Sequence, residues 1–503
     1  MLNRCLRILT LFAFSSLISN GNAAAQEDLD TLDSWVRAMH PAPFIRCGEE
    51  AWMKRLKLTR EQWPNASHID RVQLTNLLLQ TMQDSHSGVS GFHWIWDVEK
   101  KHGTLPVRWA IEGRGLWVLD SGLPGLPEEV RVLNINGLPA ENVVQAALNL
   151  STMEGPSYKA TSRTAAHNIT PWILAKFDTS TVTITWIDEK QGKPITRSFH
   201  AQKWRQARKG WARISATRPV VDWTFPDGSK LTRLDERRHV KQNHRLAEAQ
   251  KKRRIQTHWS GAATLKISSF SQGPWARYQK RLTRGFQRVK DMNCPLILDL
   301  RGNPGGQSPR MEMLWNYVAT SARHLPFALV AKQSHPTSRA NGRHYKRLRK
   351  RWVDKHLHHS ADAKYIFTLA TLPLGAIDTL FFPKKRVPQQ SFKGPLAVLI
   401  DGESASASVS LAGALQDSER GPLIGESCLG PKNGTMGNPY IRTLPKSGIQ
   451  VSLSTAVYMA EPCTNWKETN PIKPDVLIPA MWKRNSELNE SLRLWIDSQS
   501  KKP

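Results

Sequence analysis

A serine-rich turn between a predicted strand and a predicted helix carries the clearest chemical signal in the sequence. Residues 401–408 read DGESASAS. They follow the apolar run 395–400 and precede a predicted helix that includes Leu411. Small side chains let a substrate approach a hydroxyl closely, and free N–H groups at a helix N-terminus favour a developing negative charge. These residues suit a serine nucleophile. A serine that only caps the helix fits them equally well.

A glycine turn earlier in the chain offers a second chemical group. Residues 301–306 read RGNPGG, directly after the apolar run 295–300. Adjacent glycines free backbone N–H groups to point at an anion, so Gly305 and Gly306 suit an oxyanion hole or a phosphate. The turn lacks the Gly-Lys-Ser/Thr of a Walker loop and does not fit the dinucleotide-binding fingerprint.

The elements around these turns indicate how they are positioned. Strand-like segments at 264–270 and 295–300 flank a helical segment at 275–291, and another helix follows the glycine turn. Strands that alternate with helices predict an α/β domain with a largely parallel sheet. Residues 325–390 show little pattern and are expected to be an insertion in this domain.

The rest of the chain is predicted to form separate regions, which makes the protein α+β overall. Apolar residues recur at helical spacing between Leu29 and Met82. Short strands and turns, ending in a strand, Asn-Gly and a helix, give a partial PDZ-like segment. The predicted division is 1–25 signal peptide, 26–100 helical N-terminal region, 101–150 PDZ-like segment, 151–260 strand-rich and basic connecting region, and 261–485 catalytic domain.

Together, the two turns and the motifs near them resemble the serine peptidase family of the C-terminal-processing (tail-specific) proteases and the tricorn core protease. The resemblance covers roughly residues 263–478 and implies a catalytic domain of the ClpP/crotonase-like type. In register with that family, Ser406 takes the place of the nucleophile. The N–H of Ala407, with one from Gly305 or Gly306, would form the oxyanion hole. The family implies polypeptide substrates and needs no metal or organic cofactor.

The family uses two kinds of general base, and the sequence favours one of them. Where the tail-specific branch carries its lysine this chain has Pro431, with Lys432 one place later, so Lys432 is the alternative base. The tricorn-like branch uses a histidine preceded by a serine, which Ser85 and His86 resemble. Imidazole, with an ordinary pKa near ~6.5, accepts a proton at neutral pH, whereas a lysine needs a depressed pKa.

The resemblance also implies a carboxylate that supports the histidine. Residues 468–476 resemble the acidic ending of the family motif, with Glu468 in the matching place. Glu468 would orient the imidazole of His86 directly or through Ser85, and stabilise its charged form. An exposed ion pair is the ordinary alternative for such a glutamate.

The first residues predict export. Basic residues precede an apolar run over 8–18, which is too short for a membrane span, and an Ala-x-Ala exit follows near Ala25. We therefore expect a periplasmic or extracellular protein after cleavage. Four cysteines would remain, which permits two disulfides in three pairings. They are Cys47, Cys294, Cys428 and Cys463, and the pair Cys428–Cys463 is favoured.

The chain is strongly basic, with 71 Lys and Arg against 42 Asp and Glu and a net charge of +29. Basic clusters lie at 237–254 and 346–351. In an exported protein these clusters favour an anionic envelope surface as partner, while solvated helix faces without a partner fit as well. No specific nucleic acid is expected.

Taken together, the sequence predicts an exported serine endopeptidase with Ser406 as nucleophile and His86 as base. Two alternatives stay open. One is a non-catalytic binding protein on the same fold. The other is a peptidase that uses a dyad of Ser406 and Lys432.

Overall fold

The computed structural model describes residues 27–155, 158–188, 191–207, 221–231, 259–271, 273–322, 328–334, 372–382, 387, 389, 391–460, 470–478 and 485–500. The predicted signal peptide and both basic clusters lie outside these ranges, as do Cys463 and Glu468. Within them, no helix has the length and apolar character needed to cross a membrane.

A six-stranded sheet forms the centre of the C-terminal half, in the order β19-β14-β13-β10-β9-β8. Its first five strands are parallel, and β8 is antiparallel to β9. The middle strands are almost entirely apolar because both faces of the sheet are covered. The strands are β8 (Val221–Thr224), β9 (Ala263–Ile267), β10 (Leu296–Asp299), β13 (Leu396–Ile400), β14 (Leu423–Gly425) and β19 (Val476–Leu477).

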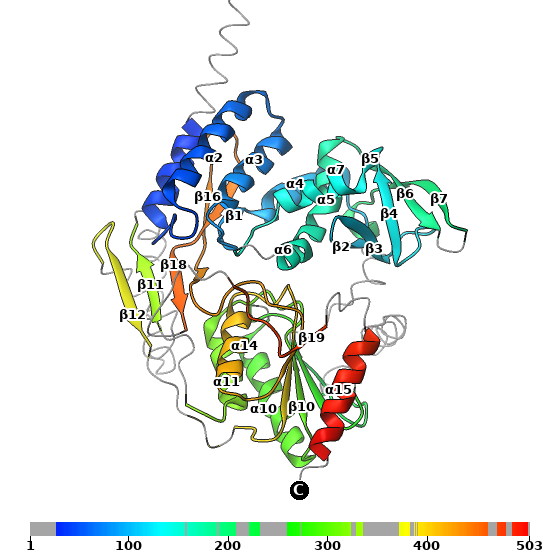
Figure 1. Ribbon diagram of the computed structural model, residues 1–503, viewed down its shortest axis with the longest axis vertical. Coiled ribbons are helices and arrows are strands. Elements are labelled where there is room, and N and C mark those ends of the chain that lie inside the picture. Colours follow the sequence, from blue (N-terminus) through cyan, green and yellow to red (C-terminus); the bar gives the residue numbers. More distant parts are fainter. Residues whose placement is uncertain are drawn as a thin grey trace, which may run out of the picture.

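Helices pack on both faces of this sheet (Figure 1). Along β10, Leu296 and Leu298 face α10 (Trp275–Asp291), α11 (Ser308–Val318) and α14 (Ala407–Asp417), while Ile297 faces α15 (Asn485–Ser500). Each layer therefore has its own apolar core. The predicted α/β class of this domain is confirmed.

The N-terminal half has a core that helices and a second sheet share. This sheet has the order β2-β3-β4-β6-β7, with β5 beside β4, so it continues past residue 150. The helices are that over 27–39, α2 (Glu49–Gln62), η1 (Trp63–Asn65), α3 (His68–Gln80), α4 (Gly91–His102), α5 (Ala140–Asn149), α6 (Tyr158–Ala165), η2 (Ala166–Asn168) and α7 (Ile169–Lys176). The strands are β2 (Val107–Glu112), β3 (Gly115–Ser121), β4 (Val130–Ile135), β5 (Leu138–Pro139), β6 (Thr181–Asp188) and β7 (Lys193–His200).

Two smaller sheets connect distant parts of the chain. In one, β1 pairs with β17, so that Gly88 lies opposite Ser452. In the other, the order is β12-β11-β18-β15, and β11 and β12 belong to the segment expected to be an insertion. Their strands are β1 (Gly88–Val89), β16 (Tyr440–Thr443), β17 (Gln450–Leu453), β11 (Ala328–Lys332), β12 (Ile377–Phe381), β15 (Thr435–Gly437) and β18 (Ala456–Met459). The pairing of β1 fixes the turn just before it, which carries His86.

The cysteines correct one expectation. Cys428 is a free thiol, and it is completely buried beside the apolar core under α14. Burial raises the pKa of this thiol. The favoured disulfide of Cys428 with Cys463 is therefore not formed in this structure; Cys463 itself lies outside the described residues. Cys47 and Cys294 are free as well.

Candidate active site

Ser406 lies in a strained turn at the start of α14. Its backbone has φ 54° and ψ −119°, a conformation that residues with a Cβ rarely adopt. Such strain persists only where the surroundings enforce it, and it is typical of functional sites. A sharp strand-to-helix turn of this kind exposes the nucleophile of α/β hydrolases. Ser406 is half-buried, and its hydroxyl has no hydrogen-bond partner within the described residues.

The neighbouring serines have structural contacts instead. Ser404 is fully buried and its hydroxyl donates to the carbonyl of Leu300 at 3.0 Å. Ser408 is also fully buried and donates to the carbonyl of Asn303 at 3.0 Å. Both therefore attach the serine turn to the glycine turn, and of these three hydroxyls only that of Ser406 is left for chemistry.

The glycine turn lies directly against Ser406. A Cβ at Gly305 would come within 2.6 Å of the Ser406 Cβ and 2.9 Å of the Ala407 nitrogen. The Gly305 N–H donates to the side-chain oxygen of Asn303 at 2.9 Å. In the described part of the chain, the N–H groups of Gly306 and Ala407 have no such partner. Of the three predicted oxyanion-hole residues, Gly306 and Ala407 thus have N–H groups available.

A buried carboxylate shapes the serine turn from below. One oxygen of Asp401 accepts hydrogen bonds from the N–H groups of Gly302 and Glu403 and lies 3.2 Å from the hydroxyl oxygen of Ser404. Burial, followed by the nearby negative charge of Glu403, raises the pKa of Asp401 to about 6. Asp401 therefore links the serine turn and the glycine turn with a charge that is lost on mild acidification.

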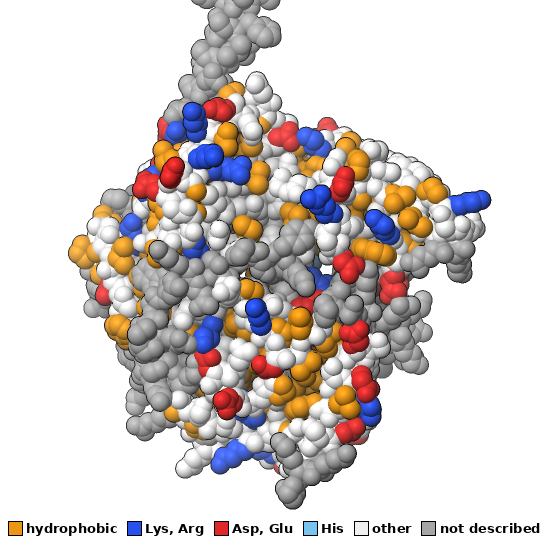
Figure 2. All heavy atoms as spheres, in the orientation of Figure 1, with side chains coloured by type: hydrophobic (Ala, Val, Ile, Leu, Met, Phe, Trp, Pro, Cys, Tyr) orange, Lys and Arg blue, Asp and Glu red, His pale blue; other side chains and the backbone are white. Residues whose placement is uncertain are grey.

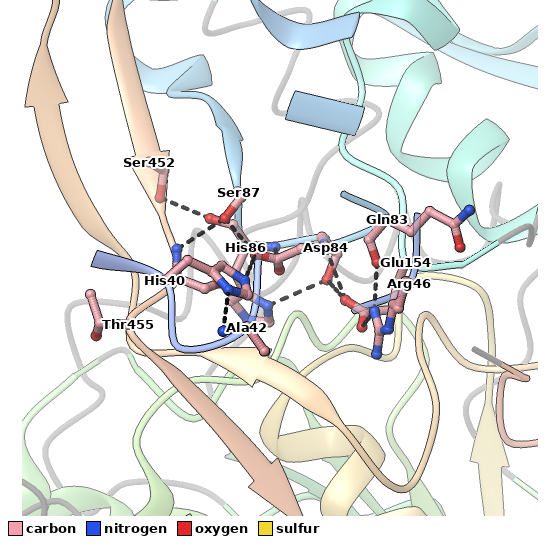
Figure 3. Close-up of polar contacts among 12 residues, drawn as sticks. His40, Ala42, Arg46, Gln83, Asp84, His86, Ser87, Glu154, Ser452 and Thr455 are labelled. Carbon is pink, nitrogen blue, oxygen red and sulfur yellow. Dashed lines mark hydrogen bonds and ion pairs between the residues drawn. The ribbon is translucent and has the colours of Figure 1, made fainter. Parts of the chain in front are cut away.

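His86 lies in a turn that buried charges hold in place (Figure 3). The Ser85 hydroxyl lies 3.3 Å from His86 Nδ1 and donates to Glu154 Oε2 at 2.5 Å. Glu154 in turn accepts from Arg46 at 2.6 Å, and both side chains are at most 1% exposed. The Nε2 atom of His86 has no partner within the described residues, so it is free to accept a proton.

Asp84 fixes the backbone of the same turn. Its Oδ1 accepts from the His86 N–H at 2.9 Å, and its Oδ2 accepts from the Ser87 hydroxyl and lies 3.4 Å from His40 Nε2. Burial alone raises the pKa of the Asp84 carboxyl, but His40 and His86 bring it below its ordinary value. The Asp84 carboxylate is therefore charged beside the His86 imidazole over the whole physiological pH range.

Residues 429–430 bring the two turns together. Leu429 pairs with Ala405, the residue before Ser406. At the next position, a Cβ on Gly430 would lie 3.1 Å from Glu154 Cγ. Consecutive Cα atoms are ~3.8 Å apart. The dipeptide Leu429–Gly430 therefore contacts the Ser406 turn through Leu429 and the side chain of Glu154 through Gly430.

Lys432 lies away from Ser406. Its ammonium contacts Asp417 at 2.8 Å, and its side chain runs along Gly413 of α14. Asp417 ends the helix that Ser406 begins, and eleven residues of helix rise ~16 Å. The Lys432 ammonium therefore lies toward the end of α14 that is opposite Ser406. Glu468, the predicted supporting carboxylate, lies outside the described residues.

Asp84, His86 and Glu154 offer donor atoms within 4.8 Å of one another, a spacing that a metal ion would fit. Their present contacts oppose such use. Glu154 is neutralised by the guanidinium of Arg46, and Asp84 accepts from the His86 N–H and the Ser87 hydroxyl. A cation at this place would have to compete with a buried arginine.

Sequence reasoning missed His40, Arg46 and Glu154. Each is a single polar residue in a helical or loop segment, far in sequence from the motif it supports. The sequence offered only a weak indication of Glu154: it precedes Gly155 in a segment without regular helical or strand spacing. Only the fold places these three residues around Ser85 and His86.

Comparison with known proteins identifies a family model and structures of similar fold. Residues 261–478 match the model of peptidase family S41. No curated protein sequence matches this chain.

Solved structures with a similar fold include three of CPAF. Mature CPAF aligns at 14% identity over 95% of this chain and 98% of its own, with a TM-score of 0.60. A CPAF mutant aligns at 13% identity over 96% and 99% of the two chains, with a TM-score of 0.64. Mature CPAF complexed with lactacystin gives 14% identity, 95% and 99% coverage, and a TM-score of 0.61. The similarity extends over both halves of the chain and concerns the fold.

Proposed function

We propose that this chain, a serine-type peptidase that belongs to peptidase family S41, is an exported endopeptidase that cleaves polypeptides through an acyl-enzyme on Ser406. His86 acts as general base and then as general acid. The N–H groups of Ala407 and Gly306 hold the oxyanion.

The reaction follows from the free atoms of the two turns. Ser406 Oγ attacks the scissile carbonyl while its proton passes to His86 Nε2. The carbonyl oxygen becomes an anion, which the two N–H groups and the N-terminus of α14 stabilise. Collapse breaks the C–N bond, and His86 returns the proton to the leaving amine. Water then hydrolyses the ester by the same steps.

One observation carries this proposal: the strained backbone of Ser406 with the glycine turn against it. A serine that only caps a helix has an extended backbone and donates or accepts at its own helix start. Ser406 has positive φ and makes no side-chain capping bond. The strain is therefore unexplained by capping, while exposing a nucleophile accounts for it.

A serine-reactive phosphonate probe tests the proposal. We expect it to label the protein, and we expect labelling and peptide cleavage to disappear in Ser406→Ala and to fall by roughly 10³-fold or more in His86→Ala. Lys432→Ala is the matched control and should retain both. Absence of labelling in the wild type would favour a binding protein on this fold, and full activity in His86→Ala would reject the assigned base.

Export and surface binding belong to the same proposal and rest on the sequence. Figure 2 shows positive and negative side chains interspersed over the described part of this face. The basic clusters at 237–254 and 346–351, to which surface binding is assigned, carry +12 of the net +29 of the sequence. Binding to anionic vesicles that survives neutralisation of both clusters would contradict this assignment, and a retained, uncleaved N-terminus in the secreting host would contradict export.

A further inference from the structure

We propose that Glu154, held by Arg46, is a positioning residue that fixes the His86 imidazole through the Ser85 hydroxyl. This inference rests on the proposed function, because it assigns a partner to the proposed general base. It places the supporting carboxylate in the segment after α5, far from the motif in which the sequence predicts it.

The contacts around Ser85 are short and specific. Glu154 Oε2 accepts from both the N–H and the hydroxyl of Ser85, at 2.9 and 2.5 Å. A single carboxylate oxygen thus holds the backbone and the side chain of the residue before His86. Since Ser85 Oγ is 3.3 Å from His86 Nδ1, the ring is oriented by the same group.

Proton counting assigns the tautomer of His86. A serine hydroxyl has one proton, and a carboxylate only accepts, so the Ser85 proton lies on the bond to Glu154. Ser85 Oγ can then only accept from His86 Nδ1, which must carry the ring proton. In neutral imidazole the other nitrogen is then unprotonated, and Nε2 is left to take the proton of Ser406.

Arg46 keeps Glu154 in this role. Its guanidinium donates to Glu154 at 2.6 Å, to the Gln83 carbonyl at 2.5 Å and to the Gly434 carbonyl at 2.7 Å. These bonds hold Glu154 between the Ser85 turn and the strand β15. They also keep the carboxylate charged at full burial, because an ionised acid without a partner there would be too costly.

The same charges stabilise the imidazolium that forms during the reaction. In the described part of the chain, donor oxygens of Asp84 and Glu154 lie within 4.8 Å of a ring nitrogen of His86, with Arg46 paired to Glu154 and His40 next to Asp84. The negative charges of these two carboxylates are therefore close to the ring. A positive charge on His86 is therefore favoured in the transition state, as in other serine peptidases with a buried acid.

Two variants test the relay, by which we mean the contacts from Glu154 through the Ser85 hydroxyl to His86 Nδ1. Ser85→Ala removes the bridging hydroxyl and leaves the pair of Arg46 and Glu154 intact. Glu154→Gln replaces the acceptor by an amide and removes its charge. We expect each to lower kcat/KM by roughly 10²-fold, below the ~10⁴-fold that loss of a directly bonded carboxylate costs a serine protease. In Glu154→Gln the acid limb of the kcat/KM profile should also move to lower pH.

Glu426→Gln is the matched control for the loss of a buried carboxylate. Glu426 pairs with Arg163 at 2.7 Å and is itself 11% exposed, but it does not touch the His86 turn. It should lower thermal stability as Glu154→Gln does, while kcat/KM stays within about 3-fold and the pH profile keeps its shape. Loss of activity in both variants alike would mean a structural role and overturn the relay.

The tautomer gives a readout that does not need activity. In protein labelled with ¹⁵N-histidine, the His86 signals, identified by their loss in His86→Ala, should show the Nδ1–H form. In Ser85→Ala they should shift toward the Nε2–H form. An inactive protein with this pattern keeps the relay and rejects the proposed function. An active protein whose His86 is Nε2–H, or whose Ser85→Ala variant is fully active, rejects the relay alone.

A metal at the same cluster is the competing explanation. We expect EDTA to leave activity and the His86 signals unchanged. If EDTA abolished cleavage and Zn²⁺ restored it, Asp84, His86 and Glu154 would be metal ligands and the relay would be wrong.

Discussion

The two turns that carry the proposed reacting groups are built in opposite ways. The Ser406 turn is held mainly by contacts with the main chain, namely a glycine in direct contact, two buried serine hydroxyls on carbonyls and a parallel sheet beneath, with one buried carboxylate, Asp401. The His86 turn is held by buried charges, which come from Arg46, Asp84 and Glu154. The nucleophile is thus positioned within one domain, while the base depends on side chains from distant segments.

This difference predicts which kind of substitution destabilises each of the two turns. Backbone contacts at a sheet edge tolerate side-chain changes but not an added Cβ. Buried ion pairs tolerate changes of shape poorly, because removing one partner leaves an uncompensated charge. The first turn should therefore fail through crowding and the second through loss of charge balance.

The largest expected effect is on the charged turn. Arg46→Met leaves Glu154 buried without its cation and should cost about 3–5 kcal/mol of unfolding free energy. Urea denaturation followed by circular dichroism measures this. The double variant Arg46→Met with Glu154→Leu should recover part of the loss, since no unpaired charge remains. A single-variant loss below about 1 kcal/mol would erase the distinction between the turns.

The second largest loss of unfolding free energy is expected from crowding the Ser406 turn. Gly305→Ala places a Cβ within 2.6 Å of the Ala405 carbonyl at φ 89°, which should cost roughly 3–4 kcal/mol from overpacking and left-handed strain. Gly48→Ala is the control, because its φ of 77° is similar and nothing lies within 4 Å. It should cost only about 1 kcal/mol. Equal losses in thermal or urea unfolding would show that contact with the serine turn is unimportant.

The carboxylate below the serine turn predicts a pH dependence. The pKa of Asp401 is raised to about 6 in the folded protein, so protons bind the folded state more tightly between about pH 4 and 6. Its contribution to stability is present below pH 4 and is lost as the pH rises through 6. Asp401→Asn lacks this dependence and should gain about 3 kcal/mol relative to the wild type between pH 4 and 7.

Unfolding free energies of the wild type and of Asp401→Asn at several pH values measure this difference. A difference that stays constant from pH 4 to 7 would show that Asp401 has an ordinary acidity. The serine turn would then hold a carboxylate that stays charged near neutral pH, as the His86 turn does, and the contrast between the two turns would weaken.

The strain at Ser406 predicts a small gain in stability. Glycine adopts positive φ without cost, so Ser406→Gly should be about 1 kcal/mol more stable than Ser406→Ala, although both lack the hydroxyl. Differential scanning calorimetry of the two variants compares them directly. A less stable glycine variant would mean that the turn is relaxed.

The smallest effect is expected at Lys432. Its ion pair with Asp417 is partly exposed, so Lys432→Met should change the unfolding free energy by less than about 1 kcal/mol. Cleavage should stay within about 2-fold of the wild type, as measured with any cleavable peptide. A large loss of cleavage at unchanged stability would support Lys432 as the general base.

The contrast between the turns also explains what the sequence could predict. The Ser406 turn, the glycine turn and the α/β class are readable because strand, turn and helix follow one another in the chain. Glu154, Arg46 and His40 carry no local pattern, since what they do depends on contacts between segments roughly 40 to 400 residues apart. The free thiol of Cys428 was missed for a related reason: its pairing was inferred from the positions of cysteines along the chain, which do not determine which side chains meet.

Because β1 pairs with β17, the His86 turn can be completed only after β17 has been synthesised. The His86 carbonyl accepts from the Ser452 hydroxyl, and the Ser87 hydroxyl oxygen accepts from the Ser454 N–H, so the histidine turn depends on residues 452–454 for its contacts. During synthesis the N-terminal half emerges first, without that strand. We therefore expect a chain truncated before residues 450–454 to lack the contacts that hold the His86 turn, so that the proposed general base would not be positioned.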